Sequence, residues 1–147
     1  MKSPRIPRHL LPQMHALPPL RLAGYARTRV MVYGTLLSGE PNHRVLEGAR
    51  FIARAQTPPS FRMYDLGGCP AVTTGGDTIH GEVYDVDERT LARLDRLEVH
   101  PTLYRRTRIH LADGSRAEIY LLASMGRIEG RPVIASGDWR ARGKCGP

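Results

Sequence analysis

One acidic residue of this chain, Glu98, occupies a helix position where the pattern predicts an apolar residue. Glu98 follows Leu91 by seven residues and Leu94 by four, so it falls on the apolar stripe of a helix. A carboxylate on a buried face must be paired, hydrogen-bonded or protonated, because burying it alone is costly. Such a group can serve as a general acid or base. In the alternative, Glu98 reaches solvent at the helix end or pairs with Arg105 or Arg106.

A short turn is the second feature whose residues could take part in chemistry. The apolar, strand-like segment Val30–Tyr33 runs directly into Gly34, Thr35 and Leu36. Glycine at this point permits a positive φ and lets a ligand approach the backbone closely. Successive amide groups around Thr35 and Leu36 can then form an anion-binding nest. The turn alone is a common pattern, but together with Glu98 it indicates an enzyme that moves protons on a small anionic or zwitterionic substrate.

The helix that carries Glu98 has clear start and stop signals. Asp87 is a good N-cap residue, and Val86 and Leu91 have the spacing of a hydrophobic staple. Pro101 ends the helix soon after Glu98. We therefore expect one main helix between Asp87 and Pro101, with Glu98 near its end.

The rest of the chain reads mostly as strand. Branched residues or alternation favour strands at Val30–Tyr33, about 48–57, Ala71–Thr73, Ile79–Val86, Tyr104–Leu111 and Ala117–Ala123. Asp113-Gly114 predicts a hairpin between the last two. A short second helix is expected over His43–Leu46, and the segments 56–70 and 124–135 are expected to be loops. One long helix among several strands, with no internal repeat, indicates the α+β class.

Composition places most of the positive charge outside the expected domain. The chain of 147 residues is long enough for one domain with a real core, and its net charge is +8. Residues 1–29 hold six basic residues and no acidic one, whereas the remainder holds 16 basic and 14 acidic residues. The domain itself is therefore nearly neutral. Aromatic residues are few and the usual nucleic-acid-binding motifs are absent from the sequence, so we expect no nucleic-acid partner.

Residues 1–28 form a basic tail with five prolines, which we expect to lack fixed structure, and residues 29–147 form the domain. The tail's apolar runs are too short for a secretory signal, and no segment has the roughly twenty apolar residues of a membrane helix. The two cysteines, Cys69 and Cys145, favour a reducing cytoplasm over a disulfide framework. Without a Cys/His cluster, HExxH or a glycine-rich nucleotide motif, we expect neither a metal nor a cofactor.

Six segments in order carry a family resemblance. They are Tyr33–Leu36, Pro41–Leu46, Tyr64–Val72, Gly81–Val86, Leu94–Arg106 and Ser136–Trp139. Together they resemble the gamma-glutamylcyclotransferase-like family over roughly residues 29–140. The pattern departs at Val99, where the family usually has glycine after the glutamate.

The resemblance implies both a fold and a reaction. The fold is a small mixed-strand β-barrel, with the helix of Glu98 beside the mouth of a cavity. In the reaction, the α-amine of a γ-glutamyl amide attacks its own γ-carbonyl, giving 5-oxoproline and a free amine, with Glu98 as base and then acid. Substrate binding falls to four residues of the turn, namely Tyr33, Gly34, Thr35 and Leu36. The leaving amine and the oligomeric state are left open.

Other residues and functions have competing interpretations. Tyr104 is a candidate pocket wall or hydroxyl donor near Glu98, or simply an aromatic residue that starts a strand, and Tyr120 is a candidate for the same cavity. Asn42 and His43 read as a solvated loop or helix cap. The alternative to an enzyme is a non-catalytic protein of the same fold that binds a small γ-glutamyl metabolite. A second alternative is an interaction protein that uses the basic tail on an acidic partner.

Overall fold

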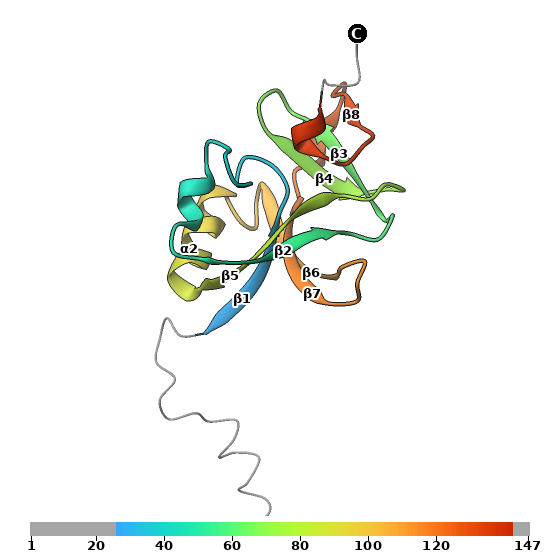
Figure 1. The fold of residues 1–147 in the computed structure, drawn as a ribbon. Coiled ribbons are helices and arrows are strands. Elements are labelled where there is room, and N and C mark those ends of the chain that lie inside the picture. The colour runs from blue at the N-terminus through green and yellow to red at the C-terminus, as the bar shows by residue number, and fades with distance from the viewer. Residues whose placement is uncertain (1–25, 143–147) are drawn as a thin grey trace, which may run out of the picture.

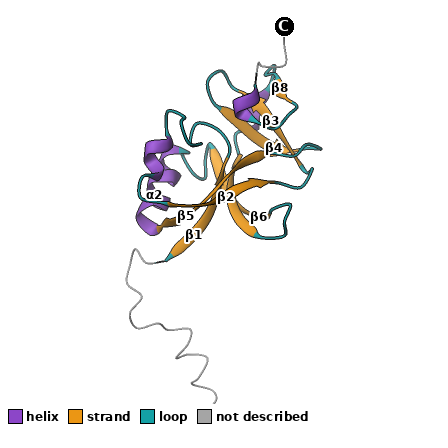
Figure 2. Cartoon of the chain, in the orientation of Figure 1, coloured by secondary structure: helices purple, strands orange, loops and turns teal. Residues whose placement is uncertain are grey.

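The computed structural model describes residues 26–142 of the chain. The expected tail over 1–28 lies almost entirely outside the described residues, and so does Cys145. Within them, the chain forms two β-sheets, one main α-helix and several short 3₁₀ helices (Figures 1 and 2). The predicted α+β class is confirmed.

The larger sheet has five strands in the order β2-β5-β1-β7-β6. Its strands are β1 (Arg27–Val32), β2 (Arg50–Gln56), β5 (His80–Asp87), β6 (Tyr104–His110) and β7 (Arg116–Leu122). All neighbours are antiparallel except β1 and β7, which run parallel, so the predicted mixture of strand directions is present. The central strand β1 ends in three residues that are almost fully buried, Val30, Met31 and Val32. It therefore delivers the following turn from the middle of the sheet.

The smaller sheet has three strands in the order β4-β3-β8, namely β4 (Pro70–Thr74), β3 (Phe61–Asp65) and β8 (Val133–Ile134). The expectation that 56–70 and 124–135 are loops was wrong where β3 and β8 form. Phe61 and Met63 alternate with Arg62 and bury their side chains against the core, so a two-residue period was present but short. The closure of the strands into the predicted barrel stays a prediction.

The main helix α2 (Glu88–Leu97) has the predicted boundaries. The Asp87 carboxylate accepts a hydrogen bond from the amide of Thr90 at 2.8 Å, which makes Asp87 the N-cap residue. Glu98 is the C-cap residue. The helix lies on one side of the large sheet and contacts β1, β5 and the 3₁₀ helix η2 (His43–Leu46), which is the expected short second helix (Figure 1).

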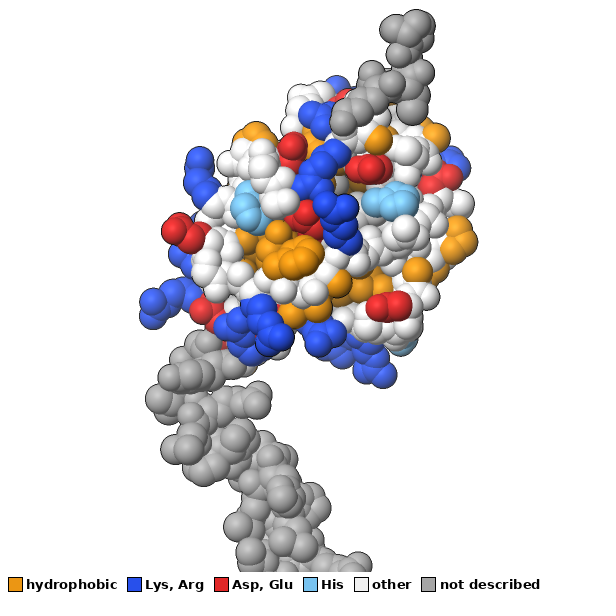
Figure 3. All heavy atoms as spheres, in the orientation of Figure 1, with side chains coloured by type: hydrophobic (Ala, Val, Ile, Leu, Met, Phe, Trp, Pro, Cys, Tyr) orange, Lys and Arg blue, Asp and Glu red, His pale blue; other side chains and the backbone are white. Residues whose placement is uncertain are grey.

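Charged side chains of both signs share the surface of the domain. Figure 3 shows basic and acidic side chains interspersed on one face, without a continuous basic surface. Among residues 26–142, no helix is long and apolar enough to cross a membrane.

Candidate active site

A cavity of about 200 Å³ lies where the end of β1 meets the end of α2 and the start of β6. Every residue expected to form the site lines it: Tyr33, Gly34, Thr35, Leu36, Glu98, Tyr104 and Tyr120. The lining also includes residues that were not expected there: Met31, Val32, Asn42, Cys69, Pro70, Leu97 and Leu103. The fold thus brings the predicted residues together, while the role of each stays a prediction.

Glu98 is carried by a well-defined helix end. The amide of Val99 donates to the carbonyl of Arg96 at 3.2 Å, and the amide of His100 donates to that of Asp95 at 2.9 Å. This pair of bonds is a Schellman motif, which satisfies the last carbonyls of a helix. The backbone on both sides of Glu98 is therefore hydrogen-bonded.

The Glu98 carboxyl group has no hydrogen-bond or ion-pair partner among residues 26–142. The side chain is half-buried, and burial raises the pKa of its carboxyl to about 7. The expected alternative of a pair with Arg106 is wrong, because Arg106 binds Asp95 and Glu118 instead. A carboxyl group with a pKa near 7 can accept and return a proton at neutral pH.

Val99 has an unusual backbone conformation for a branched residue. Its φ of 51° lies in the left-handed region that favours glycine, at the position where a Schellman motif usually has glycine. Non-glycine residues in this region carry strain of about 1–3 kcal/mol. The side chain is 50% exposed, so burial gives little in return. The structure thus explains why glycine suits this position and what valine costs there.

The turn after β1 is held through its carbonyl groups. They accept hydrogen bonds from the protein: Gly34 O from the amide of Leu37 (3.0 Å), Thr35 O from the amide of Asn42 (2.9 Å) and Leu36 O from Nδ1 of His43 (2.9 Å). By contrast, the amides of Gly34, Thr35 and Leu36 donate to no acceptor in the described part of the chain. Because these residues line the cavity, their amides can serve an anionic ligand.

The expectation that Gly34 uses a positive φ is wrong, and the structure gives a steric reason for glycine at this position. Its φ is not in the left-handed region. A Cβ atom added at this position would lie 2.4 Å from Cγ and 2.6 Å from Cδ of Pro70. The ring of Pro70, which also lines the cavity, occupies the space that a side chain would need.

The three tyrosines of the cavity direct their hydroxyl protons to protein acceptors. Tyr33 donates to the carbonyl of Tyr120 at 2.6 Å, Tyr104 to the carbonyl of Pro70 at 2.8 Å, and Tyr120 to Asp95 at 2.7 Å. Burial is the main cause that raises the pKa of each hydroxyl. Tyr104 both begins β6 and lines the cavity. The arrangement favours a pocket wall over a free hydroxyl donor for Tyr104.

Asn42 and His43 support the turn. Asn42 precedes η2, but its side chain makes no cap hydrogen bond and donates instead to the hydroxyl of Thr35 at 2.9 Å. The ring of His43 bonds to the carbonyl of Leu36. Neither role was visible in the sequence, because polar residues shortly after a turn usually face solvent.

Among residues 26–142, no group of three or more His, Cys, Asp or Glu side chains is placed to hold a metal ion. The titratable side chains that line the cavity are the Glu98 carboxyl, the Cys69 thiol and the tyrosine hydroxyls. Glu98 is the group in this set whose pKa is moved to near neutrality. Glu98 can therefore take part in proton transfer at neutral pH.

Comparison with known proteins identifies relatives of the chain. A family model described as gamma-glutamyl cyclotransferase, AIG2-like, matches residues 30–141. The gamma-glutamylcyclotransferase family protein YtfP of Escherichia coli is 33% identical over 116 residues, which cover 79% of this chain and 99% of that protein. A gamma-glutamylaminecyclotransferase of Bos taurus is 44% identical over 93 residues, which cover 56% of this chain and 55% of that protein. The crystal structure of an AIG2-like protein from Mus musculus matches with a TM-score of 0.67 at 30% identity, covering 76% of this chain and 88% of that one.

Replacing Val99 with glycine should stabilise the protein. Relief of the left-handed strain, about 1–3 kcal/mol, exceeds the entropic cost of glycine, about 0.5–1 kcal/mol. We expect a gain of about 1 kcal/mol in the free energy of unfolding, measured by urea denaturation. Val133→Gly is the control, because Val133 is also exposed but has an ordinary φ, and it should lose stability. A loss in both variants would contradict the strain at Val99.

Replacing Gly34 with alanine should destabilise the protein by about 1–3 kcal/mol, because the new methyl group overlaps the ring of Pro70. Urea denaturation measures this loss. Gly76→Ala is the matched control, since a Cβ atom at Gly76 meets nothing within 4 Å. Equal stability of the two variants would show that the Pro70 ring can move aside.

Proposed function

The chain belongs to the gamma-glutamyl cyclotransferase, AIG2-like family, and from this premise we propose that it converts a γ-glutamyl amide to 5-oxoproline and a free amine. One observation carries the proposal: the cavity wall holds a half-buried carboxyl group, Glu98, with no protein partner in the described residues and a pKa raised to about 7. A general acid–base group with such a pKa works at neutral pH. The turn whose amides donate to no acceptor in the described part of the chain lines the same cavity.

The turn is proposed to bind the anionic part of the substrate. The amides of Gly34, Thr35 and Leu36 would receive either the α-carboxylate of the glutamyl group or the oxyanion that develops on its γ-carbonyl. Either contact favours a curled substrate, in which the α-amine lies against the γ-carbon. Orientation of this kind lowers the barrier of an intramolecular reaction by restricting motion before the chemical step.

Glu98 is proposed to move the protons of the reaction. Its carboxylate takes a proton from the α-ammonium group, and the resulting amine attacks the γ-carbon to form a new C–N bond. The tetrahedral intermediate then breaks its bond to the leaving nitrogen, which receives a proton from Glu98. After the attack the α-nitrogen still carries one proton more than the lactam N–H of the product. Glu98, ionised again by its donation, takes this second proton and passes it to the released amine, which departs as an ammonium ion. One carboxyl group can therefore act first as base and then as acid.

The substrate is proposed to be small. The cavity volume of about 200 Å³ is below the roughly 300–1,000 Å³ of pockets that enclose drug-sized ligands. The relative from Bos taurus is named for γ-glutamylamines, which makes these compounds the first to test. γ-Glutamyl amino acids and γ-glutamyl-ε-lysine complete the panel, and the amide with the highest kcat/KM identifies the leaving group.

Glu98→Gln should reduce 5-oxoproline release by about 10²-fold or more, because glutamine keeps the shape of the side chain but cannot carry the proton. For the unmodified protein, kcat/KM should fall with decreasing pH below a midpoint near 7, where Glu98 becomes protonated. The exposed Glu129→Gln is the control and should retain the activity. A midpoint below about pH 5 would remove Glu98 from the role of a shifted base.

The same assay separates an enzyme from a binding protein. If no amide in the panel is turned over, yet a γ-glutamyl compound raises the melting temperature, the non-catalytic metabolite-binding alternative takes precedence. Turnover by the unmodified protein together with loss in Glu98→Gln excludes it.

The raised pKa of Glu98 also predicts how stability depends on pH. Between pH 4.5 and about 7 the carboxyl is protonated in the folded protein and ionised in the unfolded chain, so stability falls as pH rises. Glu98→Gln lacks this dependence. Relative to the unmodified protein it should gain up to about 3 kcal/mol on going from pH 4.5 to pH 8. Urea denaturation at the two pH values measures the gain, and a constant difference would contradict the raised pKa.

A further inference from the structure

A second carboxylate, Glu82 on β5, is buried outside the proposed catalytic cavity. Its side chain is 5% exposed, and it does not line the cavity that contains Glu98. It borders a separate groove of about 610 Å³, together with Leu37 and Arg140. Burying a carboxylate is costly unless it is paired and hydrogen-bonded. The residues that bind Glu82 therefore indicate which part of the structure its carboxylate stabilises.

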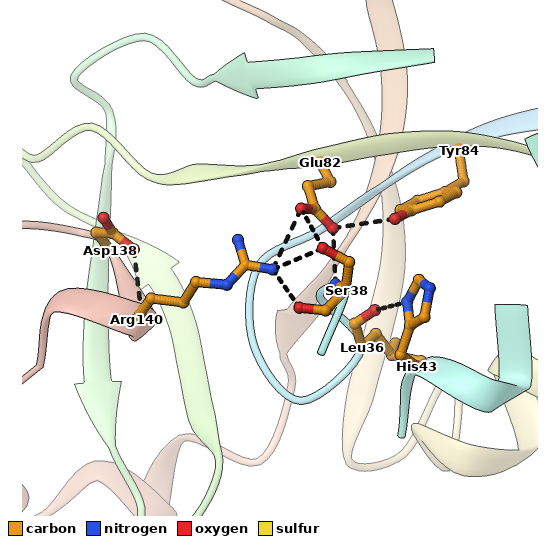
Figure 4. A network of polar contacts seen from close by, with 7 residues as sticks. All are labelled: Leu36, Ser38, His43, Glu82, Tyr84, Asp138 and Arg140. Atoms are coloured by element: carbon orange, nitrogen blue, oxygen red, sulfur yellow. Dashed lines mark hydrogen bonds and ion pairs between the residues drawn. The ribbon is translucent and has the colours of Figure 1, made fainter. Parts of the chain in front are cut away.

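The partners of Glu82 converge on one residue of the turn. The carboxylate accepts hydrogen bonds from the amide of Ser38 at 2.9 Å and from its hydroxyl at 3.0 Å. Tyr84 donates to the same carboxylate at 3.0 Å, and Arg140 forms an ion pair with it at 3.2 Å. Figure 4 shows Arg140 and Tyr84 approaching the carboxylate from opposite sides, with Ser38 next to both Glu82 and Arg140.

These contacts keep Glu82 ionised. Burial by itself raises the pKa of the carboxyl, but the hydrogen bonds from Ser38, Tyr84 and Arg140 outweigh burial and lower it. Arg140 adds a second restraint, since its guanidinium also donates to the carbonyl and the hydroxyl of Ser38. Ser38 is therefore held through its amide, its carbonyl and its side chain.

Glu82 also holds the other end of the same turn. In the pairing of β1 with β5, Val32 lies opposite Glu82. The chain leaves the sheet after Val32, forms the turn that lines the cavity, and meets Glu82 again at Ser38. Glu82 thus lies at both ends of this segment: it is the pairing partner of Val32 at one end, and its carboxylate binds Ser38 at the other.

We propose that Glu82 is a positioning residue, which fixes the conformation of the turn so that the amides of Gly34, Thr35 and Leu36 stay aimed at the substrate. The inference rests on the proposed cyclotransferase function. Glu82 does not line the cavity, and its carboxylate acts on the turn through Ser38. Misplacement by about 1 Å far from the chemistry can cost about 10²-fold in rate, so the loss of this restraint should be measurable.

Glu82→Gln tests the proposal, because glutamine cannot accept all of the bonds that Ser38, Tyr84 and Arg140 donate. The first measurement is amide hydrogen exchange without substrate. The amides of Leu37 and Asn42 close the turn through Gly34 O and Thr35 O, and both should exchange about tenfold faster or more in the variant.

The second measurement is steady-state kinetics of Glu82→Gln. We expect kcat/KM to fall by about tenfold or more, while the acidic midpoint of the pH profile, which belongs to Glu98, stays unchanged. A loss confined to KM would assign the amides to the α-carboxylate, and a loss in kcat would assign them to the oxyanion. A purely structural defect would only lower the fraction of folded enzyme, so kcat is expressed per folded enzyme, with that fraction measured by urea denaturation; a loss that disappears after this correction would overturn the positioning role.

Asp85→Asn is the matched control. Asp85 lies on the same strand and forms an ion pair with Arg27 at 3.4 Å, remote from the turn. It should leave both exchange and kinetics as in the unmodified protein. Ser38→Ala provides a second variant in case Glu82→Gln does not fold, because Ser38 is exposed and only its hydroxyl contacts are lost. Ser38→Ala should also speed the exchange of the Leu37 and Asn42 amides, but by a smaller factor than Glu82→Gln.

Hydrogen exchange and kinetics test the positioning role of Glu82 and the proposed function separately. Unchanged exchange of Leu37 and Asn42 in Glu82→Gln and Ser38→Ala overturns the positioning role. Faster exchange with unchanged kcat/KM also overturns it, since the turn would then not need this restraint. If the unmodified protein turns over no γ-glutamyl amide, the proposed function fails, and the exchange result still decides whether Glu82 fixes the turn.

Discussion

A cation beside a carboxyl group lowers its pKa and so opposes proton exchange near neutral pH. A guanidinium group within about 4–6 Å lowers the pKa of a carboxyl by about 1–3 units, which would remove Glu98 from the useful range. Arg106 begins close to the cavity, two residues after Tyr104, but its guanidinium is bound by Asp95 and Glu118. In this arrangement the charge of Arg106 is paired with Asp95 and Glu118, and the pKa of Glu98 is raised by burial.

Strand β5 and helix α2 together place Glu98 beside the turn that follows β1. β5 runs antiparallel to β1, so its last residue, Asp87, lies opposite Arg27 at the start of β1. Asp87 then caps α2, whose ten residues span about 15 Å and return the chain toward the end of β1. Glu98 and the turn meet there for this reason. The register of β1 against β5 thus sets the distance between the proposed base and the proposed anion site.

Backbone strain is found beside the proposed catalytic group. Val99 keeps the Schellman hydrogen bonds of the helix end although it must adopt a positive φ to do so. Strained residues persist where the surrounding structure determines their conformation. Here the hydrogen bonds that the amides of Val99 and His100 donate to carbonyls of α2 fix the conformation of Val99. A chain with valine therefore presents Glu98 on the same kind of helix end that glycine would give, at a lower stability.

Local patterns in the sequence located most of the elements, and together with the family resemblance they indicated the residues of the proposed site. The cap at Asp87, the stop at Pro101 and the apolar stripe located α2 and singled out Glu98, because each signal lies within a few residues of the structure it specifies. Only the tertiary structure decided that Arg106 binds Asp95, that Pro70 makes Gly34 necessary, and that Glu82 holds Ser38. The short strands β3 and β8 belong with these, since they owe their stability to strand pairing. All of these depend on which side chains meet across long separations, and such meetings follow from sheet order and register, which no local pattern encodes.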